Sequence, residues 1–99
     1  MRLTATQLQV IRQAGREIFG SDVRVRVFGS RLDDSGRGGD IDILVESDEI
    51  IDDKLMKSLT LVARLQLRLG DQPIDVLVVD PETPLNPVHR HAMQTGVTL

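Results

Sequence analysis

The sequence predicts a small α/β (α+β) fold, in which a mixed β-sheet of about three strands is flanked by helices. Three segments, 23–28, 40–46 and 73–79, are rich in β-branched residues or alternate apolar with polar residues, which is typical of strands. Other segments repeat apolar residues at helical spacing. One of these separates the second strand from the third, so a crossover can lay the two strands parallel. With 99 residues, we expect a single domain over residues 1–99.

The first helix is expected over 5–19. Thr4-Ala5-Thr6-Gln7 has the form of a capping box, with a threonine N-cap and a glutamine three positions later. Gly20-Ser21 ends the helix. The strand over 23–28 then places its valines on one face and ends at Gly29-Ser30.

Residues 31–39 contain three glycines and two aspartates, and predict a loop that could follow one helical turn. A long helix is expected over 52–69, after the strand 40–46. Its main apolar stripe consists of Leu55, Leu59, Val62, Leu65 and Leu69.

The last elements are the strand 73–79 and a short helix. Asn86 is the expected N-cap of that helix, Pro87 its first residue, and Gly96 its end.

The composition argues against a long nucleic acid or a membrane as partner. The chain has 12 basic and 15 acidic residues, whereas sequence-independent nucleic-acid binding relies on a basic surface. Phe19 and Phe28 are the only aromatic residues that could stack on bases. There is no apolar run long enough for a membrane span, no apolar signal core near the N-terminus, and no cysteine. We therefore expect a cytoplasmic protein.

Asp40, Asp42 and Asp75 are the candidate metal ligands. Asp40 and Asp42 are two apart on one strand, which places both carboxylates on the same face. Asp75 lies between Ile74 and Val76 on the third strand, and joins them if the two strands are neighbours. Carboxylates held together repel one another unless a cation lies between them, and Mg²⁺ prefers such oxygen ligands. Three acids can hold two Mg²⁺ ions for an in-line displacement at phosphorus, with Asp75 as general base or second-metal ligand.

Gly29-Ser30 is the candidate phosphate-binding turn. Glycine allows close approach of the backbone, and a turn after a strand can direct several N–H groups at an anion. The Ser30 hydroxyl can donate to a phosphate oxygen, and Arg31 adds positive charge. Arg37, farther along the loop, is expected to be solvated.

The motif Val27-Phe28-Gly29-Ser30-Arg31, nine residues, then Asp40-Ile41-Asp42-Ile43 resembles the signature of the polymerase-beta-like nucleotidyltransferase superfamily. The chain is most similar to its minimal nucleotidyltransferases, the antitoxins encoded beside HEPN-domain toxins. Gly39 departs from the pattern, since relatives often have serine there.

This resemblance implies transfer of AMP from ATP to a hydroxyl. It assigns Gly29 and Ser30 to the phosphates, Asp40 and Asp42 to the metal, and Asp75 to the third acid. In the antitoxin branch the acceptor is a tyrosine of the cognate HEPN-type toxin, which transfer neutralises.

Two alternatives stay open at the level of sequence. The chain could neutralise its partner by binding and occlusion alone, or it could transfer a nucleotide to a small molecule. Apolar residues outside the main stripe of the 52–69 helix favour a protein interface there; they are Met56, Leu61 and Leu67. Arg24 and Arg26 share a strand face and are interpreted as solubilising an edge strand.

Overall fold

The computed structural model describes residues 1–32 and 39–99 and confirms the predicted mixed sheet flanked by helices. Arg37 and most of the loop predicted over 31–39 lie outside the described residues. The elements in chain order are α1 (Ala5–Phe19), β1 (Arg24–Phe28), the 3₁₀ turn η1 (Gly29–Leu32), β2 (Ile41–Glu46), α2 (Lys54–Leu69), β3 (Ile74–Val79), α3 (Pro87–Thr95) and β4 (Val97–Thr98).

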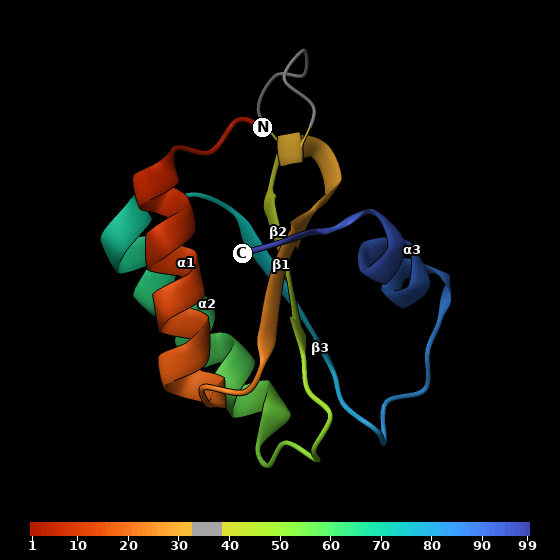
Figure 1. The fold of residues 1–99 in the computed structure, drawn as a ribbon. Coiled ribbons are helices and arrows are strands. Elements are labelled where there is room, and N and C mark those ends of the chain that lie inside the picture. Colours follow the sequence, from red (N-terminus) through yellow and green to blue (C-terminus); the bar gives the residue numbers. More distant parts are fainter. Residues whose placement is uncertain (33–38) are drawn as a thin grey trace.

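The four strands of the described chain form one sheet in the order β3-β2-β1-β4 (Figure 1). Strands β2 and β3 are parallel neighbours, as the intervening helix predicts, and β1 runs antiparallel to β2. The sequence analysis did not anticipate β4, which pairs antiparallel with β1 through Val97 and Thr98. Two residues are too few to display a strand pattern.

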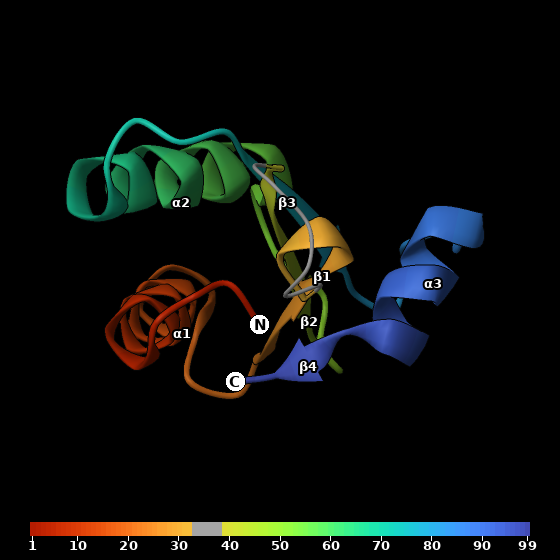
Figure 2. The same ribbon diagram turned by 90° about the horizontal axis from the view of Figure 1, so that it is seen from above.

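The helices cover the two faces of the sheet unequally. Figure 2 shows α1 and α2 together on one side of the sheet and α3 alone on the other. The main core lies under α1 and α2, and its fully buried members include Ile11, Val27 and Ile43. A smaller cluster under α3 contains Phe28, Leu44, Val79 and Ala92. In residues 1–32 and 39–99, no helix combines the length and apolar character that crossing a membrane requires.

The first helix begins and ends where its sequence signals predict. The backbone N–H of Thr4 donates to Gln7 Oε1 at 2.8 Å, and the backbone N–H of Gln7 donates to Thr4 Oγ1 at 3.1 Å. These reciprocal bonds satisfy N–H groups that have no partner inside the helix. Gly15 lies where α1 meets β1, and a side chain there would press against Val25. The helix therefore approaches the sheet closely.

The buried face of α2 differs from the predicted stripe. Leu61 and Leu65 are fully buried, whereas Leu55 and Leu59 are 74% and 56% exposed. Leu61 was expected to lie off the stripe, so that prediction was wrong. The helix packs against both α1 and β3, and Arg64 of α2 pairs with Glu17 of α1. Contact on two sides centres burial on Leu61 and Leu65 and leaves the Leu55–Leu59 side open.

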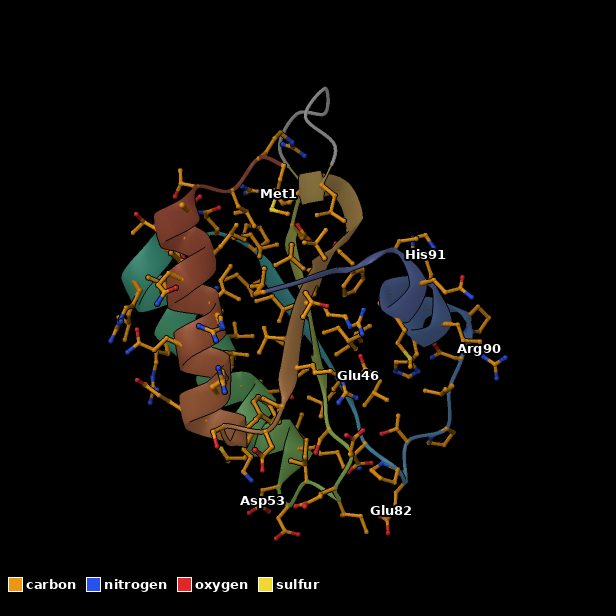
Figure 3. All side chains as sticks on the ribbon, in the orientation of Figure 1. Met1, Glu46, Asp53, Glu82, Arg90 and His91 are labelled. Atoms are coloured by element: carbon orange, nitrogen blue, oxygen red, sulfur yellow. The ribbon has the colours of Figure 1, made fainter. Side chains whose placement is uncertain are left out.

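Arg24 and Arg26 do not solubilise an edge strand, because β1 lies between β2 and β4. Arg26 Nε donates to Glu46 at 2.9 Å, and Arg24 pairs with both Glu46 and Asp48. Arg26 also donates to the carbonyl of Met93 in α3 at 3.2 Å. Figure 3 shows Glu46 on the side of the sheet that α3 covers. The two arginines thus neutralise a buried glutamate, and Arg26 also attaches α3 to the sheet.

Asp80 fixes the segment that leads into α2. Its buried carboxylate accepts from the backbone N–H of Ile51 at 2.9 Å and from Lys54 Nζ at 2.9 Å. These bonds, with those from Glu82 and Thr83, hold the pKa of Asp80 well below its ordinary value. The end of β3 is therefore tied to the start of α2.

Candidate metal centre

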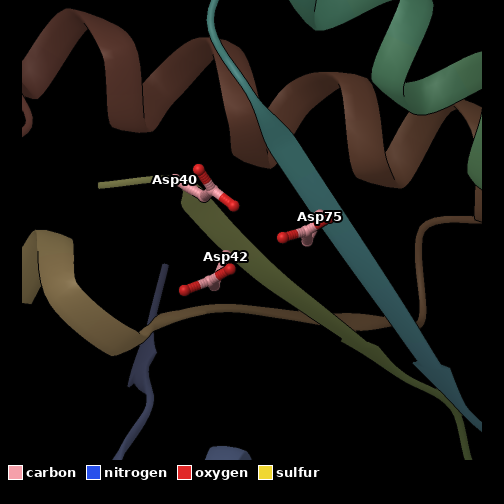
Figure 4. Close-up of side chains that lie close together, drawn as sticks. All are labelled: Asp40, Asp42 and Asp75. Carbon is pink, nitrogen blue, oxygen red and sulfur yellow. The ribbon is translucent and has the colours of Figure 1, made fainter. Parts of the chain in front are cut away.

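Three carboxylates converge at one end of the sheet. Asp42 on β2 is the register partner of Asp75 on β3, and Asp40 immediately precedes β2. One ligand oxygen from each of the three residues lies within 4.8 Å of the other two. Figure 4 shows the three side chains directed toward a common point from the two neighbouring strands. The parallel pairing of β2 and β3 therefore brings together residues that are 33 positions apart in the chain.

The three acids perturb one another. Partial burial raises the pKa of Asp42 above its ordinary value, and the charges of Asp75 and Asp40 raise it further. Desolvation also raises the pKa of Asp75, as do the hydrogen bond that its protonated form donates to the Asp40 carboxylate and the charge of Asp40. The cluster thus holds negative charge that a cation would stabilise.

The donor set fits a hard divalent cation. All three ligands are carboxylate oxygens, which Mg²⁺ prefers, and no cysteine or histidine belongs to the cluster. Asp40 and Asp75 are exposed and Asp42 is half-buried, so the site opens to solvent on one side. An open coordination sphere leaves positions for substrate oxygens.

The turn that follows β1 lies directly against the acids. Phe28, the last residue of β1, is the register partner of Asp42. Gly29 adopts φ +79, and a methyl group at its Cα would overlap Asp42 Oδ2. Only a glycine combines this backbone conformation with this close approach. Gly29 of the predicted phosphate turn and Asp42 of the predicted metal ligands therefore lie directly against each other.

Ser30 is in contact with the residue before the first acid. Its Oγ occupies the space that a side chain at Gly39 would fill, and Gly39 itself has φ +88. Glycine at position 39 is thus favoured on two counts, the backbone conformation and the contact with Ser30 Oγ. The contact couples the turn to the start of β2.

Arg31 links the turn to β3. Its Nε donates to the carbonyl of Gly39 at 3.2 Å, and its Nη2 donates to Gln72 Oε1 at 2.7 Å. Gln72 in turn donates to the carbonyl of Leu69 at the end of α2, 2.9 Å away. The guanidinium therefore acts as a brace in this structure, and its predicted contact with phosphate stays a prediction.

Two residues of this assembly escaped the sequence analysis. Gln72 receives Arg31, and Arg2 donates to the carbonyl of Ser30 at 2.8 Å. Neither carries a local signal, because each becomes relevant only through a partner at least 28 positions away.

A separate cleft of about 440 Å³ lies at the opposite end of β1 and β2. It is lined by residues 19–23 and 47–52 together with Lys57. None of Asp40, Asp42 and Asp75 lines it. This cleft is therefore separate from the carboxylate cluster.

No protein-family model matches this chain, and no curated protein matches it either.

Proposed function

We propose that this chain is a Mg²⁺-dependent nucleotidyltransferase that transfers AMP from ATP to a hydroxyl group of a cognate HEPN-type toxin, and that it thereby acts as an antitoxin in the cytoplasm. The observation that carries the proposal is the contact between Gly29 and Asp42. It places a glycine turn suited to phosphates beside three carboxylates suited to Mg²⁺. The resemblance of the motif to minimal nucleotidyltransferases supplies the reaction and the partner.

Asp40, Asp42 and Asp75 would hold the metal. Bound Mg²⁺ would offset the charge of the triphosphate and favour ionisation of the acceptor hydroxyl. The turn at Gly29 and Ser30 would bind the phosphates through backbone N–H groups and the serine hydroxyl. Asp75 would accept the proton as the hydroxyl oxygen bonds to the α-phosphorus and pyrophosphate leaves.

Occlusion of the toxin without transfer is the second candidate, and one feature favours it. The outer side of α2 carries four large apolar side chains that are mostly exposed in the described chain: Leu55, Met56, Leu59 and Leu67. Apolar side chains gathered on one helix often mark a protein interface. Binding through α2 could block a partner with the metal site unused.

The intact mass of the candidate toxin distinguishes these functions. The toxin is incubated with this protein, ATP and MgCl₂, and its mass is compared with that of the untreated toxin. We expect the mass to rise in steps of one AMP, because the α-phosphorus stays with the acceptor.

The control is the double variant Asp40→Asn/Asp42→Asn, which keeps the size of both side chains and removes their negative charges. It should add no AMP. A toxin that gains no mass but still forms a stable complex with both proteins would contradict the transfer function and favour occlusion. Equal AMP addition by the variant would contradict the site.

A further inference from the structure

Strand β3 forms an open edge of the sheet. The order β3-β2-β1-β4 places β3 at one end of the sheet and β4 at the other. Strand β4 has two residues and β3 has six, so β3 provides the long free edge of the described sheet. The unpaired backbone groups of such an edge can accept a further strand.

The backbone of β3 alternates between its two sides. The carbonyl of Pro73 accepts from the N–H of Ile41 at 3.0 Å, and that of Val79 accepts from the N–H of Ser47 at 2.8 Å. In a parallel ladder every second residue bonds to the neighbouring strand, so the odd-numbered residues of β3 face β2. The even-numbered residues therefore direct their N–H and C=O groups outward, and in the described chain these groups have no hydrogen-bond partner. They belong to Ile74, Val76 and Val78.

The burial of the two parallel strands agrees with an open edge. The central residues of β2 are fully buried, because strands lie on both sides of them; they are Ile43, Leu44 and Val45. Their register partners in β3 are only half-buried; they are Val76, Leu77 and Val78. The lower burial in β3 is what the missing neighbour on its outer side predicts.

The edge lacks the residues that usually prevent a further strand from pairing. Proteins protect exposed edges with proline and with charged side chains, lysine above all. The six residues of β3 include no proline, lysine or arginine. Their only charged member is Asp75, which belongs to the carboxylate cluster. An open edge beside a candidate active site is suited to bind an extended peptide by strand addition.

A strand added to β3 would bring side chains directly to the carboxylates. Residues opposite one another on neighbouring strands share a face, with Cβ atoms about 4.5–5.5 Å apart. The residue opposite Asp75 would therefore stand on the face where Asp40, Asp42 and Asp75 converge (Figure 4). A hydroxyl group on that residue would lie beside the acid that is proposed as general base.

The charges at the two ends of the edge distinguish between possible occupants. Asp71 precedes β3, Glu82 follows it, and both are exposed. If a second copy paired antiparallel along β3, Asp71 of each copy would lie near Glu82 of the other. Like charges that face each other destabilise a strand pair. A segment that carries lysine or arginine would instead be attracted to both ends.

We propose that the free edge of β3 binds an extended basic segment of the acceptor protein as an additional strand, and that this segment presents the hydroxyl group that receives AMP opposite Asp75. The inference rests on the proposed function, because it names the part of the toxin on which that reaction acts. The acceptor oxygen bonds to the α-phosphorus, the bond to pyrophosphate breaks, and Asp75 takes the hydroxyl proton.

The first test uses Val78→Pro, with Val78→Ala as the matched control. Proline removes the outward N–H of position 78 and leaves the bonds to β2 in place, whereas alanine shortens the side chain and keeps that N–H. Position 78 lies three residues from Asp75 and outside the carboxylate cluster. Melting temperatures and calorimetric titration with Mg·ATP establish that both variants are folded and bind the nucleotide.

The rate of AMP addition, followed by the intact mass of the candidate toxin, gives kcat/KM for the toxin. We expect this value to be about fivefold to tenfold lower in Val78→Pro than in Val78→Ala, the effect of losing one main-chain hydrogen bond. The Kd for Mg·ATP should be equal in the two variants, because the edge takes no part in binding the nucleotide.

Amide hydrogen exchange of the wild type, resolved by residue with NMR, tests the docking itself. In the free protein the N–H groups of Val76 and Val78 should exchange faster than those of Asp75 and Leu77, which bond to β2. Excess toxin should slow exchange at Val76 and Val78. This measurement decides the matter even if Val78→Pro does not fold, since it uses the wild type alone.

Equal kcat/KM values in the two variants would overturn the inference, as would exchange at Val76 and Val78 that the toxin leaves unchanged. Transfer of AMP by the wild type would in those cases still uphold the proposed function. Slower exchange at higher concentrations of this protein without toxin would assign the edge to a second copy and overturn the inference as well. A wild type that adds no AMP to the toxin would refute the proposed function, and the inference with it.

Discussion

Replacing Gly29 by alanine perturbs the contact on which the candidate site depends. The methyl group would overlap Asp42 Oδ2, and the carboxylate must retreat by about 1 Å to restore an ordinary contact. The backbone at position 29 also has φ +79, which costs a non-glycine residue about 1–2 kcal/mol. The substitution therefore has two effects, one on folding and one on the position of a metal ligand.

The effect on folding has a matched control in Gly20, which ends α1 at φ +112 and has no atom near its missing side chain. Alanine at either position should lower the melting temperature by about 4–16 °C, since 1 kcal/mol corresponds to roughly 4–8 °C in a domain of this size. Only alanine at position 29 should change metal binding. Displacing one of three ligands should weaken binding by about tenfold to a hundredfold.

Calorimetric titration with Mn²⁺ measures this difference on both variants at a temperature where both are folded. We expect Gly20→Ala to bind as the wild type does, and Gly29→Ala to bind far more weakly. Equal affinities in the two variants would refute the reasoning, because the overlap with Asp42 would then have no consequence for the metal.

Four further substitutions test other parts of the structure. Asp42→Asn should raise the melting temperature of the metal-free protein at pH 7 and abolish stabilisation by Mg²⁺. Folding raises the pKa of Asp42, so the wild type loses folding free energy when this carboxyl group ionises as the pH rises through that pKa. A lower melting temperature would contradict this. Asp80→Asn should destabilise the protein at pH 7. Because folding lowers the pKa of Asp80, its carboxylate stabilises the folded protein at a pH above its ordinary pKa of 3.8, and this stabilisation is lost as the pH falls below that value. The variant should therefore lose less stability than the wild type in an acid titration. Parallel acid transitions would contradict the role of this carboxylate. Leu61→Ala should lower the free energy of unfolding, measured by urea denaturation, by about 2–5 kcal/mol. Leu67→Ala, at an 88% exposed position, should lower it by less than about 0.5 kcal/mol. Similar losses in the two variants would contradict the observed orientation of α2.

Local signals in the sequence were sufficient for much of the fold. The capping box at Thr4 set the start of α1, and the β-branched residues between positions 40 and 46 set β2 within one residue. The convergence of Asp75 with these two acids followed from a single topological step, the parallel crossover through α2. Where a pattern and a connection rule agreed, the prediction was confirmed.

The failures share a different cause, which is dependence on neighbours distant in the chain. The burial of Leu61 follows from packing against α1 as well as the sheet, and helical spacing alone cannot choose between adjacent faces. The ion pair of Arg26 with Glu46 required knowing that β1 pairs with β2. The hydrogen bond from Arg2 to the carbonyl of Ser30 joins residues that are 28 positions apart in the chain.

A crystal structure with Mg²⁺ and a non-hydrolysable ATP analogue tests the proposed function most directly. We expect the metal to be bound by Asp40 and Asp42 at about 2.0–2.1 Å, with the triphosphate against Gly29 and Ser30. A nucleotide bound elsewhere, for instance in the cleft formed by residues 19–23 and 47–52, with the three carboxylates making no contact to metal, would contradict the account.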